Sequence, residues 1–230
     1  PARYPIWFPS NGADLRHADQ VFRPRQRGLL RQQRWRSTTR TVRGLYRGAV
    51  PLASKPHAAR RILVYGVTGS GKSTAAQHIA ERTGLPLFLA DGFCWEPGWT
   101  PVSEERQRER FEAATAGDAW VLDTAYGTSL DIAVPRAELI VALDYPRWFS
   151  LQRLVRRSVR RADTQQPICN GNTESWRRLA SRDSILRWHF RSFARKRDRI
   201  RQWAAASDGP PVLVLRRPRA LEEFIATLQR

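Results

Sequence analysis

Short apolar runs alternate with amphipathic stretches from residue 62 onward. Five of these runs are too short and too apolar to be surface strands, so we expect them to form a buried parallel sheet. The predicted strands are 62–65, 87–90, 120–122, 139–143 and 212–215. Helical segments fill the gaps, as they do in βαβ units. The pattern predicts an α/β fold of three layers, with a five-stranded parallel sheet in the middle.

Helices are expected in the stretches that follow the strands. The predicted helices are 72–82, one that begins near residue 100, 146–161 and 218–228. In the second of these, Thr100 is expected as the N-cap, Pro101 as the first position and Glu104 as part of an acidic first turn. Prolines also open the third and the last helix.

A polar segment, 163–173, separates two Arg-rich helices and contains Pro167 and Gly171. Such a sequence is typical of a mobile flap rather than of a core, and we place the flap at about 162–176. One domain is expected over 58–230. Residues 1–57 are rich in Arg, Pro, Gly and Ser and show no period, which predicts a basic, disordered extension.

The charge of the chain is unevenly distributed. The net charge is +19, and residues 1–61 alone contain 14 Arg and Lys against two Asp. A solvated tail or a misplaced translation start explains such a leader, while a transit peptide or a nucleic-acid-binding arm would share its composition. If the extension is native, weak nonspecific binding of nucleic acid through it is the expectation.

Cysteine content and hydropathy favour the cytoplasm. The two cysteines, Cys94 and Cys169, cannot form a disulfide framework and lack the spacing of a metal site, so a reducing compartment is expected. No apolar run approaches the roughly 20 residues that span a bilayer. We therefore expect no membrane partner. A monomer is the expected oligomeric state.

The strongest motif is a Walker A phosphate loop between the first strand and the first helix. It reads Gly66, Val67, Thr68, Gly69, Ser70, Gly71, Lys72, Ser73, Thr74. The glycines allow backbone amides to point at phosphate oxygens, and the helix N-terminus favours an anion. Lys72 is expected on the terminal phosphates and Ser73 on magnesium. ATP with Mg²⁺ is the predicted ligand pair.

Three carboxylates follow strands directly, at the edge where ligands bind in open α/β sheets. They are Asp91, Asp123 and Asp144, and each could hold magnesium, orient a substrate hydroxyl or cap a turn. Asp123 ends an apolar run as a Walker B acid does, so it is predicted as the second metal ligand. Asp91 opens an aromatic loop that contains Phe93, Trp95, Pro97 and Trp99 and either closes over an acceptor or packs internally.

Arginines crowd the predicted helix before the flap. Arg153, Arg157 and either Arg160 or Arg161 share one helix face and could point at one anion. Phosphoryl transfer needs such positive charge at the moving group. A solvated basic face is the alternative explanation for part of the set.

These residues resemble the adenylate-kinase-like small P-loop kinases, and specifically the family named for DNA topology modulation, also called FlaR-like. The resemblance covers about 60–228 and rests on 66–74, 91–99, 121–126 and the stretch from Asp144 through the Arg-rich helix. It implies strand order 2-3-1-4-5, a flap over the nucleotide, phosphate contacts by Arg153 and Arg157, and a metal-side role for Asp123. Adenylate kinases carry Asp-Gly-Phe-Pro-Arg where this chain has Asp-Thr-Ala-Tyr-Gly at 123–127, so their AMP-binding arginine is missing.

The sequence thus predicts an ATP-dependent kinase whose acceptor is a nucleotide or a small metabolite. In this hypothesis Lys72, Asp91, Arg153 and Arg157 are the catalytic residues. A nucleic-acid-binding regulator with ATP as a switch, and an NTP hydrolase, remain the alternatives, because a phosphate loop specifies the donor and not the acceptor.

Overall fold

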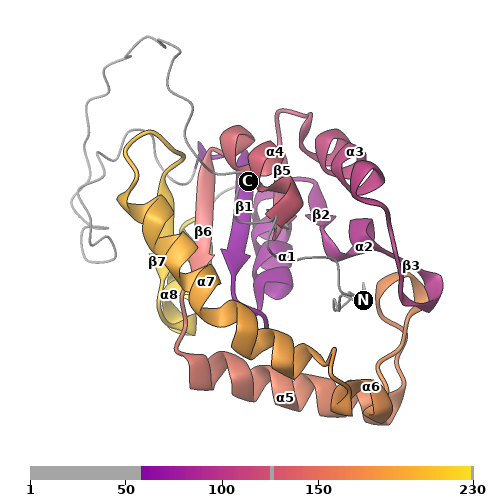
Figure 1. Cartoon of the computed structure of the whole chain (residues 1–230). Coiled ribbons are helices and arrows are strands. Elements are labelled where there is room, and N and C mark those ends of the chain that lie inside the picture. Colours follow the sequence, from indigo (N-terminus) through magenta and orange to yellow (C-terminus); the bar gives the residue numbers. More distant parts are fainter. Residues whose placement is uncertain (1–57, 125–126, 229–230) are drawn as a thin grey trace, which may run out of the picture.

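A five-stranded parallel sheet forms the centre of the computed structural model, which describes residues 58–124 and 127–228 (Figure 1). Its strands are β1 (Arg61–Gly66), β2 (Leu87–Leu89), β5 (Trp120–Asp123), β6 (Leu139–Leu143) and β7 (Val212–Leu215). Their order in space is β2-β5-β1-β6-β7, and all four pairings are parallel. The predicted strands, the three-layer α/β class and the 2-3-1-4-5 order are confirmed.

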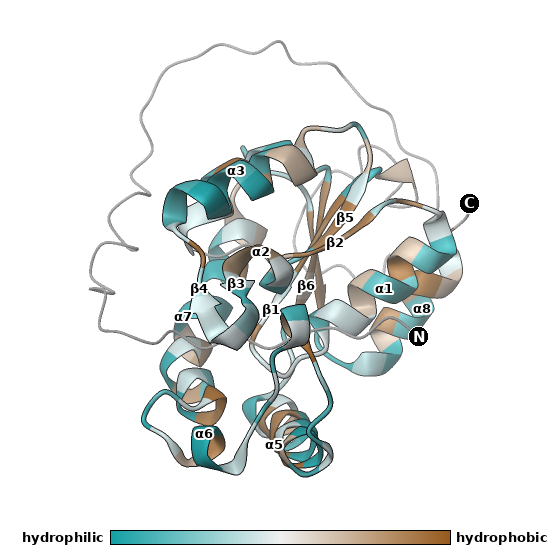
Figure 2. Ribbon diagram, turned by 90° about the vertical axis from the view of Figure 1, so that its right-hand side faces the viewer, coloured by the Kyte–Doolittle hydropathy of each residue, from teal (hydrophilic) through white to brown (hydrophobic). Residues whose placement is uncertain are grey.

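Helices cover both faces of the sheet (Figure 2). One face carries α1 (Lys72–Thr83) and α8 (Pro218–Thr227); the other carries α3 (Glu104–Thr115), α4 (Leu130–Arg136) and α7 (Ile185–Ala205). Alternate residues of β1 point to opposite faces, as strand geometry requires. Ile62 and Val64 pack with Ile79 on the first face, while Leu63 packs with Ile200 on the second. Each fully buried aliphatic side chain contributes about 1.5–3 kcal/mol.

The carboxyl ends of the strands face the long helix α5 (Arg147–Thr164), as the strand arrows in Figure 1 show. Helix α6 (Trp176–Ala180) follows α5. On the same side lie the short helix α2 (Asp91–Cys94) and a small hairpin of β3 (Trp95–Glu96) and β4 (Thr100–Pro101). Short 3₁₀ turns span Pro97–Trp99, Gly127–Ser129 and Cys169–Gly171.

The predicted start of the second helix is wrong. Thr100 and Pro101 pair with β3 in the hairpin, and the helix begins at Glu104. Its N-cap is Ser103, whose hydroxyl accepts from the Arg106 backbone N–H at 3.4 Å. A proline suits both a first helical position and an edge strand, so Pro101 alone could not distinguish them.

The polar segment after α5 contributes to the core. Helix α5 extends to Thr164, and beyond it Ile168 and Cys169 are buried in the same cluster as Trp95 and Trp99. Whether the segment moves as a flap stays a prediction. The expected extension, 1–57, and Ala125 and Tyr126 of the resemblance lie outside the described residues. In 58–124 and 127–228, no helix is long and apolar enough to cross a bilayer.

Candidate functional site

The phosphate loop, 66–74, curls tightly between β1 and α1. Gly69 and Gly71 have φ values of +83° and +92°, in the region that favours glycine. A Cβ on Gly66 would lie 2.9 Å from the Leu143 carbonyl oxygen, and one on Gly71 would lie 3.0 Å from an Nη of Arg153. All three glycines are therefore needed, and α5 is packed closely against the loop. The loop ends at the N-terminus of α1, where a helix favours an anion.

Lys72 opens α1 and reaches back over the loop. Its Nζ donates to the Val67 carbonyl oxygen at 3.1 Å. Burial lowers the pKa of Lys72, and the carboxylates of Asp123 and Asp91 oppose that shift. The ammonium is thus held over the concave side of the loop, where a phosphate oxygen could replace the carbonyl as its partner.

Ser73 and Asp123 meet beside the loop. The Ser73 hydroxyl donates to Asp123 Oδ2 at 2.5 Å, and Asp123 Oδ1 accepts from the Ala90 backbone N–H at 2.9 Å. Burial, followed by the nearby Asp91 carboxylate, raises the pKa of Asp123 to about 7. A hydroxyl and a carboxylate are hard oxygen donors of the kind that Mg²⁺ prefers. The pair therefore fits the magnesium role predicted for it.

Asp91 is the first residue of α2 and is tied to this centre by its neighbours. Ala90, directly before it, is hydrogen-bonded to Asp123. The Asp91 carbonyl oxygen accepts from Cys169 Sγ at 3.4 Å, which links α2 to the segment after α5. The Asp91 carboxylate also acts on the pKa values of Lys72 and Arg157. The structure brings Asp91, Lys72 and Asp123 to one edge of the sheet.

The arginines of α5 separate into two sets. Arg157 and Arg161 are partly buried, and burial lowers the pKa of each, that of Arg161 to about 10. Arg156 and Arg160 are exposed. Of the two residues left open by the spacing, Arg161 and not Arg160 thus turns inward with Arg157. Arg153 is exposed and lies beside the phosphate loop, with its guanidinium 5.6 Å from the Phe149 ring centroid.

Asp144 has a structural partner. Its Oδ1 accepts from Nε of Arg197 at 2.6 Å and its Oδ2 from Nη2 of the same residue at 3.2 Å. This bidentate pair ties α7 to the end of β6. Of the three strand-end carboxylates, Asp91 and Asp123 face the phosphate loop, and Asp144 fixes a helix.

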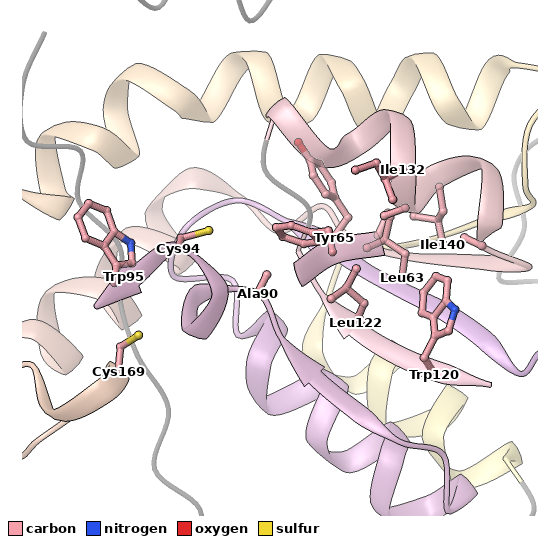
Figure 3. Close-up of a cluster of buried hydrophobic side chains, with 14 of the residues drawn as sticks. Leu63, Tyr65, Ala90, Cys94, Trp95, Trp120, Leu122, Ile132, Ile140 and Cys169 are labelled. Atoms are coloured by element: carbon pink, nitrogen blue, oxygen red, sulfur yellow. The ribbon is translucent and has the colours of Figure 1, made fainter. Parts of the chain in front are cut away.

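The aromatic loop after Asp91 packs inward and binds the segment after α5. Figure 3 shows Trp95, Cys94 and Cys169 at one end of a buried cluster that also contains Tyr65. The Trp99 backbone N–H donates to Asn172 Oδ1 at 2.6 Å, and its indole Nε1 donates to the Thr173 carbonyl oxygen at 3.0 Å. Of the two roles left open for these aromatics, internal packing is the one observed for Trp95 and Trp99.

Helix α7 and the segment after α5 supply three residues of the site that the sequence did not indicate. His189 Nδ1 lies 2.9 Å from the Thr68 carbonyl oxygen, so α7 is fixed to the phosphate loop. Lys196 lies on the same helix near Lys72 and Asp91. From the preceding segment, buried Glu174 accepts from the Ser158 hydroxyl at 3.2 Å and faces Arg157.

Two cavities flank the aromatic loop, and neither is lined by residues of the phosphate loop. One, of about 510 Å³, lies between Trp99, Asn172 and Arg178; the other, of about 620 Å³, lies between Phe93, Glu96 and Arg110. No cluster of three or more His, Cys, Asp or Glu side chains in the described part of the chain could hold a metal ion. Both cysteines are free and buried.

Residues 62–123 match the family described as the ATPase family associated with various cellular activities (AAA), a span that includes the phosphate loop and Asp123. A search of curated proteins finds no match to the sequence. The fold, with its phosphate loop between β1 and α1, is that of a P-loop NTPase.

Solved structures with a similar fold include small-molecule kinases. They include shikimate kinase from Acinetobacter baumannii in complex with shikimate (18% identity, 74% of this chain and 90% of that chain, TM-score 0.47). Shikimate kinase from Bacteroides thetaiotaomicron is 17% identical over 74% of this chain and 96% of that chain, with a TM-score of 0.45. A gluconokinase from Sinorhizobium meliloti 1021 is 18% identical over 73% and 87%, with a TM-score of 0.42. Sequence identities this low indicate a similar fold and do not indicate a shared substrate.

Proposed function

We propose that this protein is an ATP-dependent kinase that transfers the terminal phosphoryl group of Mg-ATP to a hydroxyl of a small acceptor. The observation that carries the proposal is the Ser73–Asp123–Ala90 hydrogen-bond chain, because it joins the phosphate loop to the residue before Asp91. A donor site and a carboxylate near it at one sheet edge are what phosphoryl transfer to a hydroxyl requires.

The donor side works by binding and orientation. Amides of 66–74 and the Lys72 ammonium would hold the phosphates, with Gly66, Thr68, Gly69, Ser70, Gly71 and Thr74 shaping the loop. Ser73 and Asp123 would hold magnesium, which supplies charge neutralisation at the phosphate oxygens when bound. These roles agree with the close contact of Ser73 and Asp123.

On the acceptor side, Asp91 would receive the proton of the attacking hydroxyl. The hydroxyl oxygen forms a bond to the γ-phosphorus as the bond from that phosphorus to the bridging β–γ oxygen breaks, and ADP leaves. Negative charge moves to the bridging oxygen in this step, so cations near it accelerate the reaction. We propose Arg153, which lies beside Gly71, and Arg157, whose pKa is lowered by burial and raised by the Asp91 carboxylate, as these cations.

ADP release by the full chain with Mg-ATP tests the proposal. We expect turnover that depends on one acceptor in a panel of nucleoside monophosphates and small hydroxylated metabolites, and that Lys72→Ala lowers strongly. Acceptor-independent ADP release would favour an NTP hydrolase. ATP binding without turnover would favour a regulator that uses ATP as a switch, with nucleic acid as the partner to test next.

The cytoplasm is the location that we propose for this activity. Burial raises the pKa of the Cys94 thiol strongly and that of Cys169 to about 12. Two free, buried thiols of this kind agree with a reducing compartment.

A further inference from the structure

A buried histidine of α7 holds one carbonyl group of the phosphate loop. Nδ1 of His189 lies 2.9 Å from the Thr68 carbonyl oxygen, and the side chain has no exposed surface. The ring centroids of Phe190 and Phe193 lie 5.8 and 5.4 Å from that of the imidazole, so the ring is packed among aromatic groups. The imidazole therefore approaches the loop in a fixed orientation.

The helix that carries this histidine is itself held in place. Helix α7 packs against α5 and β1, as it crosses below the strand ends in Figure 1. Arg197, further along the helix, forms its bidentate ion pair with Asp144 at the end of β6. The contact between His189 and the phosphate loop is thus supported by a second anchor of the same helix.

The contact with Thr68 determines the tautomer of His189. We assign the ring proton to Nδ1, because a carbonyl oxygen can only accept a hydrogen bond. Among the residues that the structure describes, the buried Nε2 has no hydrogen-bond partner. Burial lowers the pKa of the imidazole, and the Thr68 carbonyl opposes that shift. The positive charges of Arg147, Lys196 and Lys72 lower the pKa further, so the ring is neutral at pH 7 and contributes one N–H donor.

This hydrogen bond sets the direction of the next N–H group in the loop. The peptide bonds of the described residues are trans, and in a planar trans peptide the C=O and the following N–H point in opposite directions. The Gly69 N–H therefore points away from α7. A Cβ on Gly69 would clash with the Ser150 carbonyl oxygen, so α5 covers another side of this residue. Within 58–124 and 127–228 the Gly69 N–H donates to no acceptor, which leaves it for an oxygen of a ligand.

The peptide between Thr68 and Gly69 needs such a restraint. An N–H turned toward the ligand binds phosphate oxygens, whereas a carbonyl oxygen in its place would repel them. Gly69 has a φ of +83°, and glycine adopts φ values of either sign at little cost, so the sequence of the loop alone does not prevent rotation of this peptide. Rotation would leave the buried Nδ1–H of His189 without its acceptor, and an unpaired buried donor is costly.

We propose that His189 is a positioning residue for nucleotide binding, whose Nδ1–H holds the Thr68 carbonyl so that the Gly69 N–H faces a phosphate oxygen of Mg-ATP. The inference rests on the proposed function only as far as Mg-ATP binds at the phosphate loop, and it does not depend on the acceptor. Loss of the donor should therefore weaken nucleotide binding.

Two substitutions of His189 separate the hydrogen bond from packing. His189→Phe keeps an aromatic ring of similar size and removes the donor. His189→Asn gives up most of the ring and keeps an N–H donor near the position of Nδ1. By calorimetry with the full chain, Mg²⁺ and a non-hydrolysable ATP analogue, we expect Kd to rise about tenfold or more in His189→Phe and less than threefold in His189→Asn.

Ile200→Ala is the control for lost stability. Ile200 is a buried core residue of the same helix, eleven positions and therefore about 16 Å further along it. This variant should lower the unfolding midpoint at least as much as His189→Phe does and leave Kd for the analogue within twofold. A tenfold weaker Kd in Ile200→Ala would overturn the inference, because any damage to α7 would then have the same effect.

The other outcomes distinguish the inference from the proposed function. An unchanged Kd in His189→Phe, or equal losses in His189→Phe and His189→Asn, would overturn the inference. No binding of the analogue by the unaltered chain would overturn both. The expected Kd pattern without acceptor-dependent turnover would support the inference and count against the kinase proposal.

The tautomer provides a test that needs no stable variant. Side-chain ¹⁵N NMR of the full chain distinguishes a proton on Nδ1 from one on Nε2, and the chain has only four histidines to assign. We expect His189 to be neutral at pH 7 with its proton on Nδ1. A neutral ring with its proton on Nε2, or a doubly protonated ring, would overturn the inference.

Discussion

The donor half and the acceptor half that we propose for the site are built in different ways. The donor half is made of nine consecutive residues, 66–74, and works mainly through its backbone. The acceptor half joins α2, the aromatic loop and the segment after α5 through side chains such as Asn170 and Asn172. A loop of consecutive residues can bind any nucleoside triphosphate, whereas an assembly of distant side chains can be shaped for one acceptor.

The largest effect should come from breaking the donor half alone. Lys72→Ala removes the ammonium that lies over the loop, and we expect kcat to fall about 100- to 1,000-fold. The unfolding midpoint should change little, because the lost hydrogen bond is replaceable by water. Steady-state ADP release and thermal unfolding measure the two quantities. A variant with normal turnover would mean that ATP is not used at this loop.

The next prediction compares substitutions of two arginines of α5. Arg157 is partly buried near Asp91, while Arg160 is exposed. We expect Arg157→Gln to lower kcat/KM about 10- to 100-fold and Arg160→Gln to change it less than twofold, because screened charges in solvent contribute little. The same assay at two acceptor concentrations measures both. Equal effects in the two variants would show that α5 acts only through its overall charge.

The donor half and most of the fold could be predicted from the sequence because both depend on local patterns. Apolar runs gave the five strands, and the spacing of glycines with Lys72 gave the loop. The hydrogen bonds of Asn172 with Trp99 and of Glu174 with Ser158 join residues more than ten positions apart in the chain. No periodicity in the sequence predicts such contacts. Lys196 did leave a signal: it is one of three lysines among 40 basic residues.

The hydrogen bonds of Asn172 should be essential to the acceptor half. This buried side chain accepts from the Trp99 backbone and donates to the carbonyl oxygens of Glu96 and Cys169 at 3.0 and 2.8 Å. Asn172→Ala leaves those buried groups unpaired, so we expect a loss of about 2–3 kcal/mol in the free energy of unfolding. The acceptor KM should rise, with the ATP affinity unchanged.

Denaturant unfolding and ATP titration measure these effects of Asn172→Ala. Gln166→Ala is the control, because Gln166 is exposed in the same segment. A parallel loss of ATP affinity in Asn172→Ala would show that the two halves are not independent.

The last comparison takes one glycine from each half, and the smallest effect of all is expected for Gly98→Ala. Gly98 in the aromatic loop and Gly69 in the phosphate loop both have positive φ, +75° and +83°. A Cβ on Gly98 meets nothing within 4 Å, so Gly98→Ala should cost only the strain of that conformation, about 1 kcal/mol. A Cβ on Gly69 would clash with the backbone of Ser150 and with Leu154. Gly69→Ala should therefore cost about 2–4 kcal/mol, because overpacking adds to the strain.

Unfolding in urea with and without Mg-ATP distinguishes these two glycines. Mg-ATP should stabilise Gly98→Ala as much as the unaltered chain, since the donor half is untouched, and should stabilise Gly69→Ala much less. Equal losses of ATP-dependent stabilisation in both variants would contradict the separation of the halves. A change in the aromatic loop would then alter the phosphate loop, through Ala90 and its hydrogen bond to Asp123.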